Sequence, residues 1–273
     1  MTGIVIAFKK YNVNRGIYGS KWVGLQNFEY LFSTRDSYVI IRNTILYNVA
    51  FIIVNMVIGI ILAIMITDVV NEHMRKIYQS AILIPFTISI VVVSYIVFAL
   101  LSQENGMLNK EVIPFFGGKP IAWYNDTTYW PLILIAVNCW KGVGYGTLIY
   151  IAGIAGIDKG YYEAAELDGA SKWQEIRYIT LPELIPSIVT LLLLSIGKIF
   201  YSDFGLFYQV PQNSGSLFEV TNTIDTYVYR ALISSGGIGR SAAAGVFQSL
   251  VGFALVMTSN WIVRKISPDN AII

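Results

Sequence analysis

The sequence predicts an all-α integral membrane protein, a polytopic helical bundle, and three observations lead to this class. Hydrophobic residues make up 55% of the 273 residues, whereas charged residues make up only 13%. A soluble domain carries about 25% charged residues, because charges cover its wetted surface. The third observation is a set of five apolar segments, each with the roughly 20 residues that a helix needs to cross a bilayer.

We expect each of these segments to be a helix, because lipid offers no partner for unpaired backbone groups. The expected spans are residues 44–67, 80–101, 131–157, 184–208 and 242–263. Alternation of the spans places three long loops on one side of the membrane and two shorter segments on the other. The long loops are 9–43, 102–130 and 209–240, and the shorter segments are 68–79 and 158–182. We expect one membrane domain over residues 1–273.

Composition also argues against several function classes. The formal net charge of +2 is too small for a nucleic-acid footprint, which needs clustered Lys and Arg. A single cysteine, Cys139, excludes an internal disulfide framework, and with the single histidine, His73, it makes a dedicated metal site implausible. The sequence contains no phosphate-binding loop, nucleophile elbow or paired catalytic carboxylates, so we expect a protein that is not an enzyme.

Residues 158–182 carry the strongest local signals. They are expected to form two short helices broken at Gly169, because glycine adopts the left-handed conformation that ends many helices. Ser171 and Gln174 match a capping box that starts the second helix, and Pro182 is expected to end it. The predicted product is a rigid helical elbow joined to the next span. On the residues alone, a hairpin that merely lies on lipid headgroups is an open alternative.

The same stretch resembles the EAA signature of ABC importer permeases at every fixed position. The matching residues are Glu163, Ala164, Ala165, Gly169, Ile179, Leu181 and Pro182. Other segments resemble carbohydrate importers, and among these the permeases for polysaccharides and oligosaccharides. They are AFKKYN at 7–12, WVGLQNFEYLF at 22–32, IDTYVYR at 224–230, GVFQSLVGFALV at 245–256 and SPDNAII at 267–273.

The resemblance implies the ABC importer permease fold in the bacterial cytoplasmic membrane, with residues 158–182 facing the cytoplasm. Lys and Arg alone do not decide this orientation, because they are denser in the shorter segments but more numerous in the long loops. The family has six spans where five full ones are present here. We therefore expect that the recorded start lies inside a first helix and that the native protein has a sixth span.

The resemblance further implies a role in ATP-driven import of an oligosaccharide or polysaccharide fragment. The implied partners are a second, homologous permease, two ATP-binding subunits and an extracellular solute-binding protein. We expect no cofactor on this chain, because ATP and Mg would be bound by the ATPase subunits. The nearest alternative is a permease for another solute, such as glycerol phosphate or an amino acid.

Polar residues inside the expected spans are candidates for a substrate pathway, since a charge there costs roughly 2.5–3.5 kcal/mol on insertion scales. The candidates are Lys141 and Tyr145 in the third span and Lys198, Tyr201, Asp203, Phe204 and Tyr208 in the fourth. Tyr201, Phe204 and Tyr208 have the spacing of one aromatic stripe along a helix. A sugar cavity is one interpretation. Helix packing, with lysines that snorkel or bond neighbouring helices, is the other.

The run Gly142–Gly146 (GVGYG) contains the core of the potassium-channel filter, so an ion channel is a distant alternative. A filter is extended and re-entrant, whereas this run lies inside a continuous apolar span. Gly142, Gly146 and Gly153 fall on one helical face, which favours close helix packing. A membrane-embedded enzyme would need clustered intramembrane acids or histidines, and Asp203 has no obvious partner.

Overall fold

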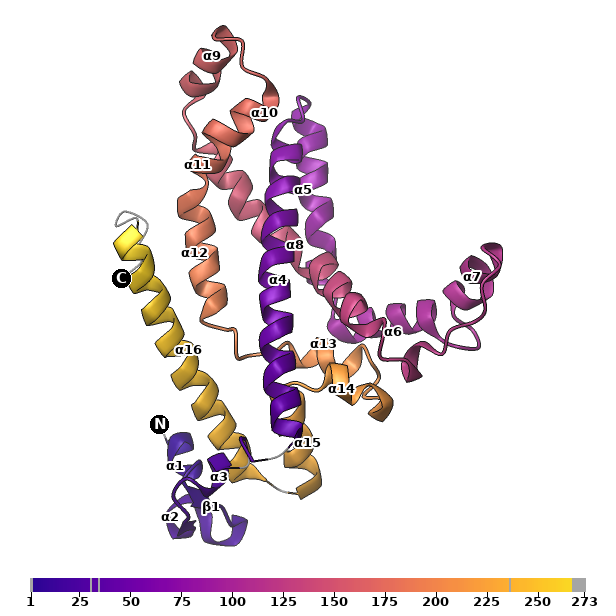
Figure 1. Cartoon of the computed structure of the whole chain (residues 1–273), viewed down its shortest axis with the longest axis vertical. Helices are drawn as coiled ribbons and strands as arrows, with labels where there is room; N and C mark the ends of the chain where they lie inside the picture. Colours follow the sequence, from indigo (N-terminus) through magenta and orange to yellow (C-terminus); the bar gives the residue numbers. More distant parts are fainter. Residues whose placement is uncertain (1, 30, 34, 236, 267–273) are drawn as a thin grey trace. The chain divides into compact units, whose positions relative to one another are not determined.

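The computed structural model describes residues 2–29, 31–33, 35–235 and 237–266 (Figure 1). These residues are mostly helical, as the sequence predicts, with one short antiparallel ribbon that pairs β1 (Lys9–Lys10) with β2 (Lys21–Trp22). The SPDNAII segment at 267–273 lies outside the described residues.

Three of the expected spans are continuous helices. They are α4 (Arg35–Thr67), α8 (Trp130–Ala155) and α16 (Ile238–Ile266). Within the described residues, these are the helices that are by themselves long and apolar enough to cross a membrane. Two pairs of shorter helices would raise the number of spans to five if each pair is one broken span. Two of the expected spans are therefore wrong as continuous helices.

The expected span 80–101 is divided between α5 (Glu72–Thr87) and α6 (Ile90–Leu101). α5 begins earlier than expected because the Asn71 side chain accepts hydrogen bonds from the first turn and caps the helix. Pro85 lies inside α5, two residues before its end, and its missing N–H removes one hydrogen bond from the last turns of the helix. Ser89 then caps α6, so the chain leaves the helix for Ile88 and Ser89 only.

The expected span 184–208 ends early. α12 (Ile185–Ile196) is followed by a non-helical stretch, 197–203, before the short helix α13 (Phe204–Gln209) begins. Tyr201 lies in the stretch and Phe204 begins α13, so the predicted stripe on one helix is wrong. Hydropathy does not reveal this break, because the backbone partners that stabilise it come from other helices.

The remaining helices are short, and several form the loops between spans. They are α1 (Thr2–Ile6), α2 (Gly16–Gly19), α3 (Gln26–Glu29), α7 (Ile113–Phe115), α9 (Lys159–Leu167), α10 (Lys172–Glu175), α11 (Leu181–Glu183), α14 (Phe218–Thr221) and α15 (Ile224–Ser235). Two π-helical turns, Leu108–Val112 and Ile176–Thr180, precede α7 and α11.

The chain divides into two compact units, described separately here, and the single domain expected over 1–273 stays a prediction. The first unit comprises Met1–Val49, Ser89–Ile135 and Gly197–Leu255, and the second comprises Ala50–Ile88, Ala136–Ile196 and Val256–Ile273. A core cluster in the first unit joins Ile40, Phe200 and Ile224. A cluster in the second joins Tyr150 and Ile154 of α8 to Leu184.

The GVGYG run lies within α8 and is helical, which contradicts a channel filter. Its closest neighbour is the α5 backbone, because a Cβ on Gly144 would lie 2.1 Å from the Ile82 carbonyl oxygen. The expected packing glycines are only partly right. Gly153 meets Leu184, but a Cβ on Gly146 would have no neighbour within 4 Å.

We predict that Gly144→Ala lowers the free energy of unfolding by about 1–3 kcal/mol, because its methyl group collides with the α5 backbone. Gly146→Ala is the matched control on the same helix, and it should leave stability unchanged or raise it slightly, since alanine favours helix. Thermal unfolding of the purified protein in detergent measures both. Equal melting temperatures for the two variants would contradict the close approach of α8 to α5.

Candidate functional site

The elbow predicted at 158–182 is present. Asp158 caps α9, and its side chain accepts a hydrogen bond from the Gly160 N–H at 2.9 Å. Gly169 follows α9 with φ +77°, the left-handed conformation that the sequence predicts. The space around a Cβ at Gly169 is open to 4 Å, so backbone conformation rather than crowding is what requires glycine there.

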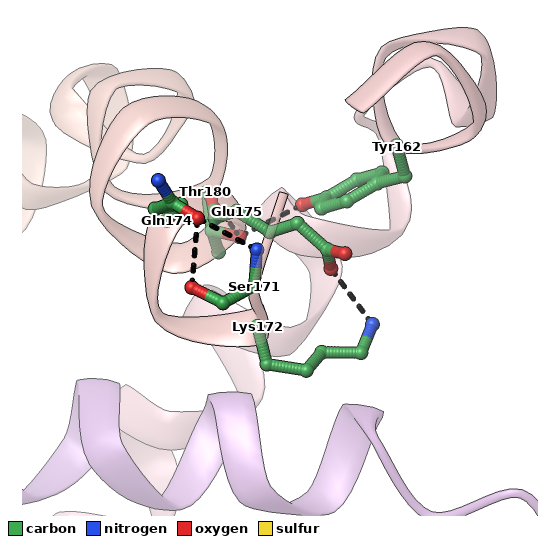
Figure 2. Close-up of polar contacts among 6 residues, drawn as sticks. All are labelled: Tyr162, Ser171, Lys172, Gln174, Glu175 and Thr180. Atoms are coloured by element: carbon green, nitrogen blue, oxygen red, sulfur yellow. Dashed lines mark hydrogen bonds and ion pairs between the residues drawn. The ribbon is translucent and has the colours of Figure 1, made fainter. Parts of the chain in front are cut away.

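The capping box at the start of α10 is also confirmed. Gln174 Oε1 accepts hydrogen bonds from the Ser171 N–H at 2.7 Å and from the Ser171 hydroxyl at 2.9 Å (Figure 2). Lys172 forms an ion pair with Glu175 at 2.7 Å, and this hydrogen bond raises the pKa of Lys172. The Glu175 side chain is nearly buried. The start of α10 is therefore held by two sets of local polar contacts, the capping box and the Lys172–Glu175 ion pair.

The second half of the elbow leads into the membrane helix across one turn residue, Leu184. α10 runs through the π-helical turn Ile176–Thr180 into α11, and α12 follows with a bend of 56°. Pro182 therefore does not end the helix as expected. It occupies the first turn of α11, where a missing N–H costs little. The elbow is thus joined directly to α12, with a bend between them.

Two contacts tie the elbow to the core of its unit. The Tyr162 hydroxyl of α9 lies 2.9 Å from Thr180 Oγ1 in the π-helical turn (Figure 2). Ile179 and Tyr162 both pack against the cluster that contains Tyr150 and Leu184. The two arms of the elbow are therefore joined to each other and to α8.

The seven residues of the motif divide by exposure. Glu163, Ala164, Gly169 and Pro182 are exposed, whereas Ala165, Ile179 and Leu181 are half-buried. The elbow also carries large exposed apolar side chains that the motif does not include. They are Tyr161, Leu167, Trp173 and Tyr178, with Leu167 90% exposed. Small residues and exposed apolar groups together make a surface that a partner protein can approach closely.

The pathway candidates in the second unit have a structural explanation. The Lys141 ammonium donates hydrogen bonds to the carbonyls of Phe86 at 3.0 Å and Ile88 at 2.7 Å. These carbonyls end α5, so Lys141 satisfies the backbone where that helix stops. Phe86 also stacks on Tyr145, with ring centroids 5.7 Å apart. Bonding of a lysine to a neighbouring helix, one of the two interpretations of the sequence, therefore describes Lys141.

In the first unit, Asp203 caps α13 by accepting a hydrogen bond from the Leu206 N–H at 3.1 Å. Phe204 stacks on Tyr208 at 5.0 Å, and both rings contact Tyr229 of α15, at 4.6 Å and 5.2 Å respectively. Tyr229 belongs to the IDTYVYR segment, but its spacing alone did not mark it as part of this aromatic group. Lys198 and Tyr201 are exposed and lie in the non-helical stretch.

Side chains from two membrane helices hold that stretch. Asn48 Nδ2 donates to the carbonyls of Ile199 at 3.0 Å and Tyr201 at 3.1 Å, and Gln248 Nε2 donates to the Phe200 carbonyl at 2.6 Å. Three consecutive carbonyls that no helix satisfies thus receive side-chain amides. A polar residue inside an apolar span is the signal that could have identified Asn48 and Gln248.

The N–H groups of the stretch have a partner as well. The Asp225 carboxylate accepts hydrogen bonds from both the Ser202 N–H and the Ser202 hydroxyl, each at 2.7 Å. Gln248 Nε2 lies 3.3 Å from the same carboxylate. Asp225 on α15 therefore connects the stretch to α16 through Gln248.

Residues 55–269 match the family model described as binding-protein-dependent transport system inner membrane component. The chain belongs to this family. It is 36% identical over 271 residues to the polygalacturonan/rhamnogalacturonan transport system permease protein YteP of Bacillus subtilis (strain 168), covering 99% of this chain and 83% of YteP.

Two solved structures are similar to the whole fold. One is a bacterial alginate ABC transporter in complex with an alginate pentasaccharide-bound periplasmic protein, with TM-score 0.86, 29% identity, and coverage of 97% of this chain and 87% of that chain. The other is a bacterial ABC transporter involved in the import of the acidic polysaccharide alginate, with TM-score 0.87, 29% identity and coverage of 97% and 88%.

Family membership confirms several predictions from the sequence. The chain is an all-α, multi-pass protein of the bacterial plasma membrane. It is a permease component of a binding-protein-dependent transport system, which makes it a transport subunit rather than an enzyme or an ion channel.

We predict that Gln248→Leu lowers the free energy of unfolding by about 1–3 kcal/mol, because the Phe200 carbonyl loses its donor in a buried position. Ser249→Ala is the matched control, since Ser249 is exposed and bonds the exposed Tyr201 hydroxyl. Thermal unfolding in lipid nanodiscs measures both changes. An equal effect of the two substitutions would contradict the role of Gln248 in holding the stretch.

Proposed function

We propose that this chain is the permease subunit of an ATP-driven importer for an oligosaccharide or polysaccharide fragment. Support for the cargo class comes from the relatives, because YteP is named for polygalacturonan and rhamnogalacturonan and both similar structures concern alginate. Glycerol phosphate and amino acids remain the alternative cargo. Comparing the uptake of labelled saccharides with that of labelled glycerol phosphate and amino acids distinguishes the two classes of cargo.

The proposed coupling element is the elbow at 158–182, which docks on an ATPase subunit in the cytoplasm. One observation carries this assignment: the capped elbow leads directly into α12, with only the bend at Leu184 between them. Glu163, Ala164 and Gly169 provide the small, exposed contact surface. Ile179 contributes differently, because it packs on the core of the unit and anchors the elbow there.

The proposed assembly contains four kinds of subunit. A second, homologous permease completes the translocation path, and two ATPase subunits bind ATP and Mg and provide the energy. A solute-binding protein outside the cell delivers cargo, in keeping with the family description and with the periplasmic protein in the similar alginate complex. ATP-driven closure of the ATPase subunits would move the elbow, tilt α12 and switch access between the two sides.

Cargo binding can shift the equilibrium between the two access states only if the cargo binds one state more tightly than the other. We propose that the aromatic and polar pathway candidates contribute those affinities. Tyrosine and phenylalanine rings can lie against the apolar C–H faces of a sugar, and polar groups can meet its hydroxyls. The proposed pathway residues are Lys141, Tyr145, Lys198, Tyr201, Asp203, Phe204 and Tyr208.

The elbow assignment is tested by Gly169→Val. A β-branched residue at φ +77° is strained, so the two arms should change their relative direction. Gly169→Asn is the matched control, because asparagine adopts left-handed conformations readily and the surrounding space is open. We expect the valine variant to insert normally but to lose ATPase co-purification and saccharide uptake. The asparagine variant should keep both, and normal uptake by the valine variant would overturn the assignment.

The exposed apolar residues of the elbow give a second test. We predict that Leu167→Ser and Trp173→Ala each weaken ATPase binding by about tenfold or more, the effect of removing an anchor of an interface. Phe115→Ala on α7 is the control, because Phe115 is also exposed but lies in an expected loop on the other side of the membrane. The measurement is the dissociation constant of the detergent-solubilised permease complex and ATPase. Equal loss with Phe115→Ala would point to a nonspecific hydrophobic effect.

A further inference from the structure

A basic pocket of about 450 Å³ lies in the first unit, between the N-terminal ribbon and the beginning of α16. Its volume is within the range of pockets that hold small ligands, about 300–1,000 Å³. Its lining consists of Lys9, Lys10, Tyr11, Val23, Gln26, Asn27, Gly237, Gly239 and Arg240. Figure 1 shows β1 beside the N-terminal end of α16.

The walls of the basic pocket are fixed by buried contacts. The Lys9 ammonium donates to the carbonyls of Ile17 at 2.9 Å and Tyr18 at 3.1 Å, which holds the ribbon in place. Asn27 Nδ2 donates to the Lys9 carbonyl at 3.0 Å. Gly239 approaches the same carbonyl so closely that a Cβ there would lie 2.8 Å from it. The ribbon, α3 and α16 therefore form a preformed cavity.

The charge of the basic pocket is one-sided. Lys10 and Arg240 bring positive charge to its lining, whereas the Lys9 ammonium is buried against two backbone carbonyls, and none of the described lining residues has a carboxylate. The Lys10 ammonium is exposed and makes no hydrogen bond or ion pair with any part of the chain that the structure describes. Gln26 and Tyr11 add neutral hydrogen-bonding groups beside these charges. This lining suits an anionic ligand that also carries hydroxyl groups.

The topology gives the side of the membrane. If the elbow is cytoplasmic, as proposed above, the C-terminal end of α16 is cytoplasmic too. Arg264 and Lys265 in its last turn fit that end, because cytoplasmic flanks are enriched in basic residues. The basic pocket at the other end of α16 then faces the outside, from which cargo arrives.

We propose that the basic pocket binds the carboxylate-bearing sugar units of an acidic saccharide on the outer face of the permease. This inference rests on the proposed function and specifies its cargo as a uronate-containing chain. Lys10 and Arg240 pair with the carboxylates, and Gln26 and Tyr11 bond the hydroxyls. A saccharide is favoured over a lipid phosphate because the pocket faces the side from which cargo arrives, and a lipid headgroup is one outcome of the test.

The test is equilibrium binding of trigalacturonic acid to the purified, nanodisc-embedded permease complex, with the trimethyl ester of the same saccharide as the uncharged probe. We expect the acid to bind more tightly than the ester. Lys10→Gln and Arg240→Gln should each weaken acid binding by about fivefold, the effect of an exposed ion pair, and leave ester binding unchanged. Lys10→Arg is the control that keeps the charge and should keep the affinity.

Acid binding that is unchanged in both glutamine variants would overturn the proposal, as would equal affinity of the wild type for the acid and the ester. Nanodiscs with and without phosphatidylglycerol provide the lipid arm. Loss of acid binding in the phosphatidylglycerol discs would identify a lipid headgroup as the occupant instead. Uptake by the complete transporter is measured separately. A failure of ATP-driven import would contradict the proposed function, whereas the binding titration alone tests the proposal about the basic pocket.

Discussion

Backbone satisfaction inside lipid is the constraint on which this fold depends. Each non-helical N–H or C=O in the hydrocarbon region costs several kcal/mol unless the protein provides a partner. The expected fourth span leaves helical geometry at 197–203, and the amides of Asn48 and Gln248 bind its carbonyls while Asp225 binds its N–H side. The end of α5 follows the same rule, with Lys141 as the donor. Both interruptions are tolerated because polar side chains from other helices bond the backbone groups that the interrupted helix leaves unpaired.

This constraint also shapes how motion could pass through the chain. α12 is a short, regular helix with a capped elbow before it and a side-chain-bonded stretch after it. The backbone groups of α12 bond one another within the helix. The backbone of residues 197–203 is instead bonded by side chains from α4, α15 and α16. Under the proposed coupling, a push on the elbow would move α12, and the hydrogen bonds at 199–202 would resist the movement. The stretch is accordingly the place where such a movement would be absorbed.

The sequence was sufficient wherever the signal is local. Gly169, Ser171 and Gln174 predict the elbow correctly, because conformation and capping depend on residues a few positions apart. Long apolar runs likewise predict α4, α8 and α16. Two breaks were missed: Pro85 and Ser89 mark the break after α5 locally but do not lower its hydropathy, and the break at 197–203 depends on Gln248, which bonds a carbonyl 48 positions earlier in the chain. The expectation that Gly146 is a packing residue failed because such packing depends on where the neighbouring helices lie.

Lys141 shows why a structural role and a cargo role are compatible at one side chain. An ammonium has three N–H donors. Among the described residues, two of them are used by the carbonyls of Phe86 and Ile88, which fixes the position of the charge. The ammonium also lies 5.8 Å from the centroid of the Phe86 ring, which stacks on Tyr145, and under the proposed function its third donor would be available to cargo. A lysine held in this way has little rotamer entropy left to lose on binding a hydroxyl, so its backbone contacts would increase its affinity for cargo rather than compete with it.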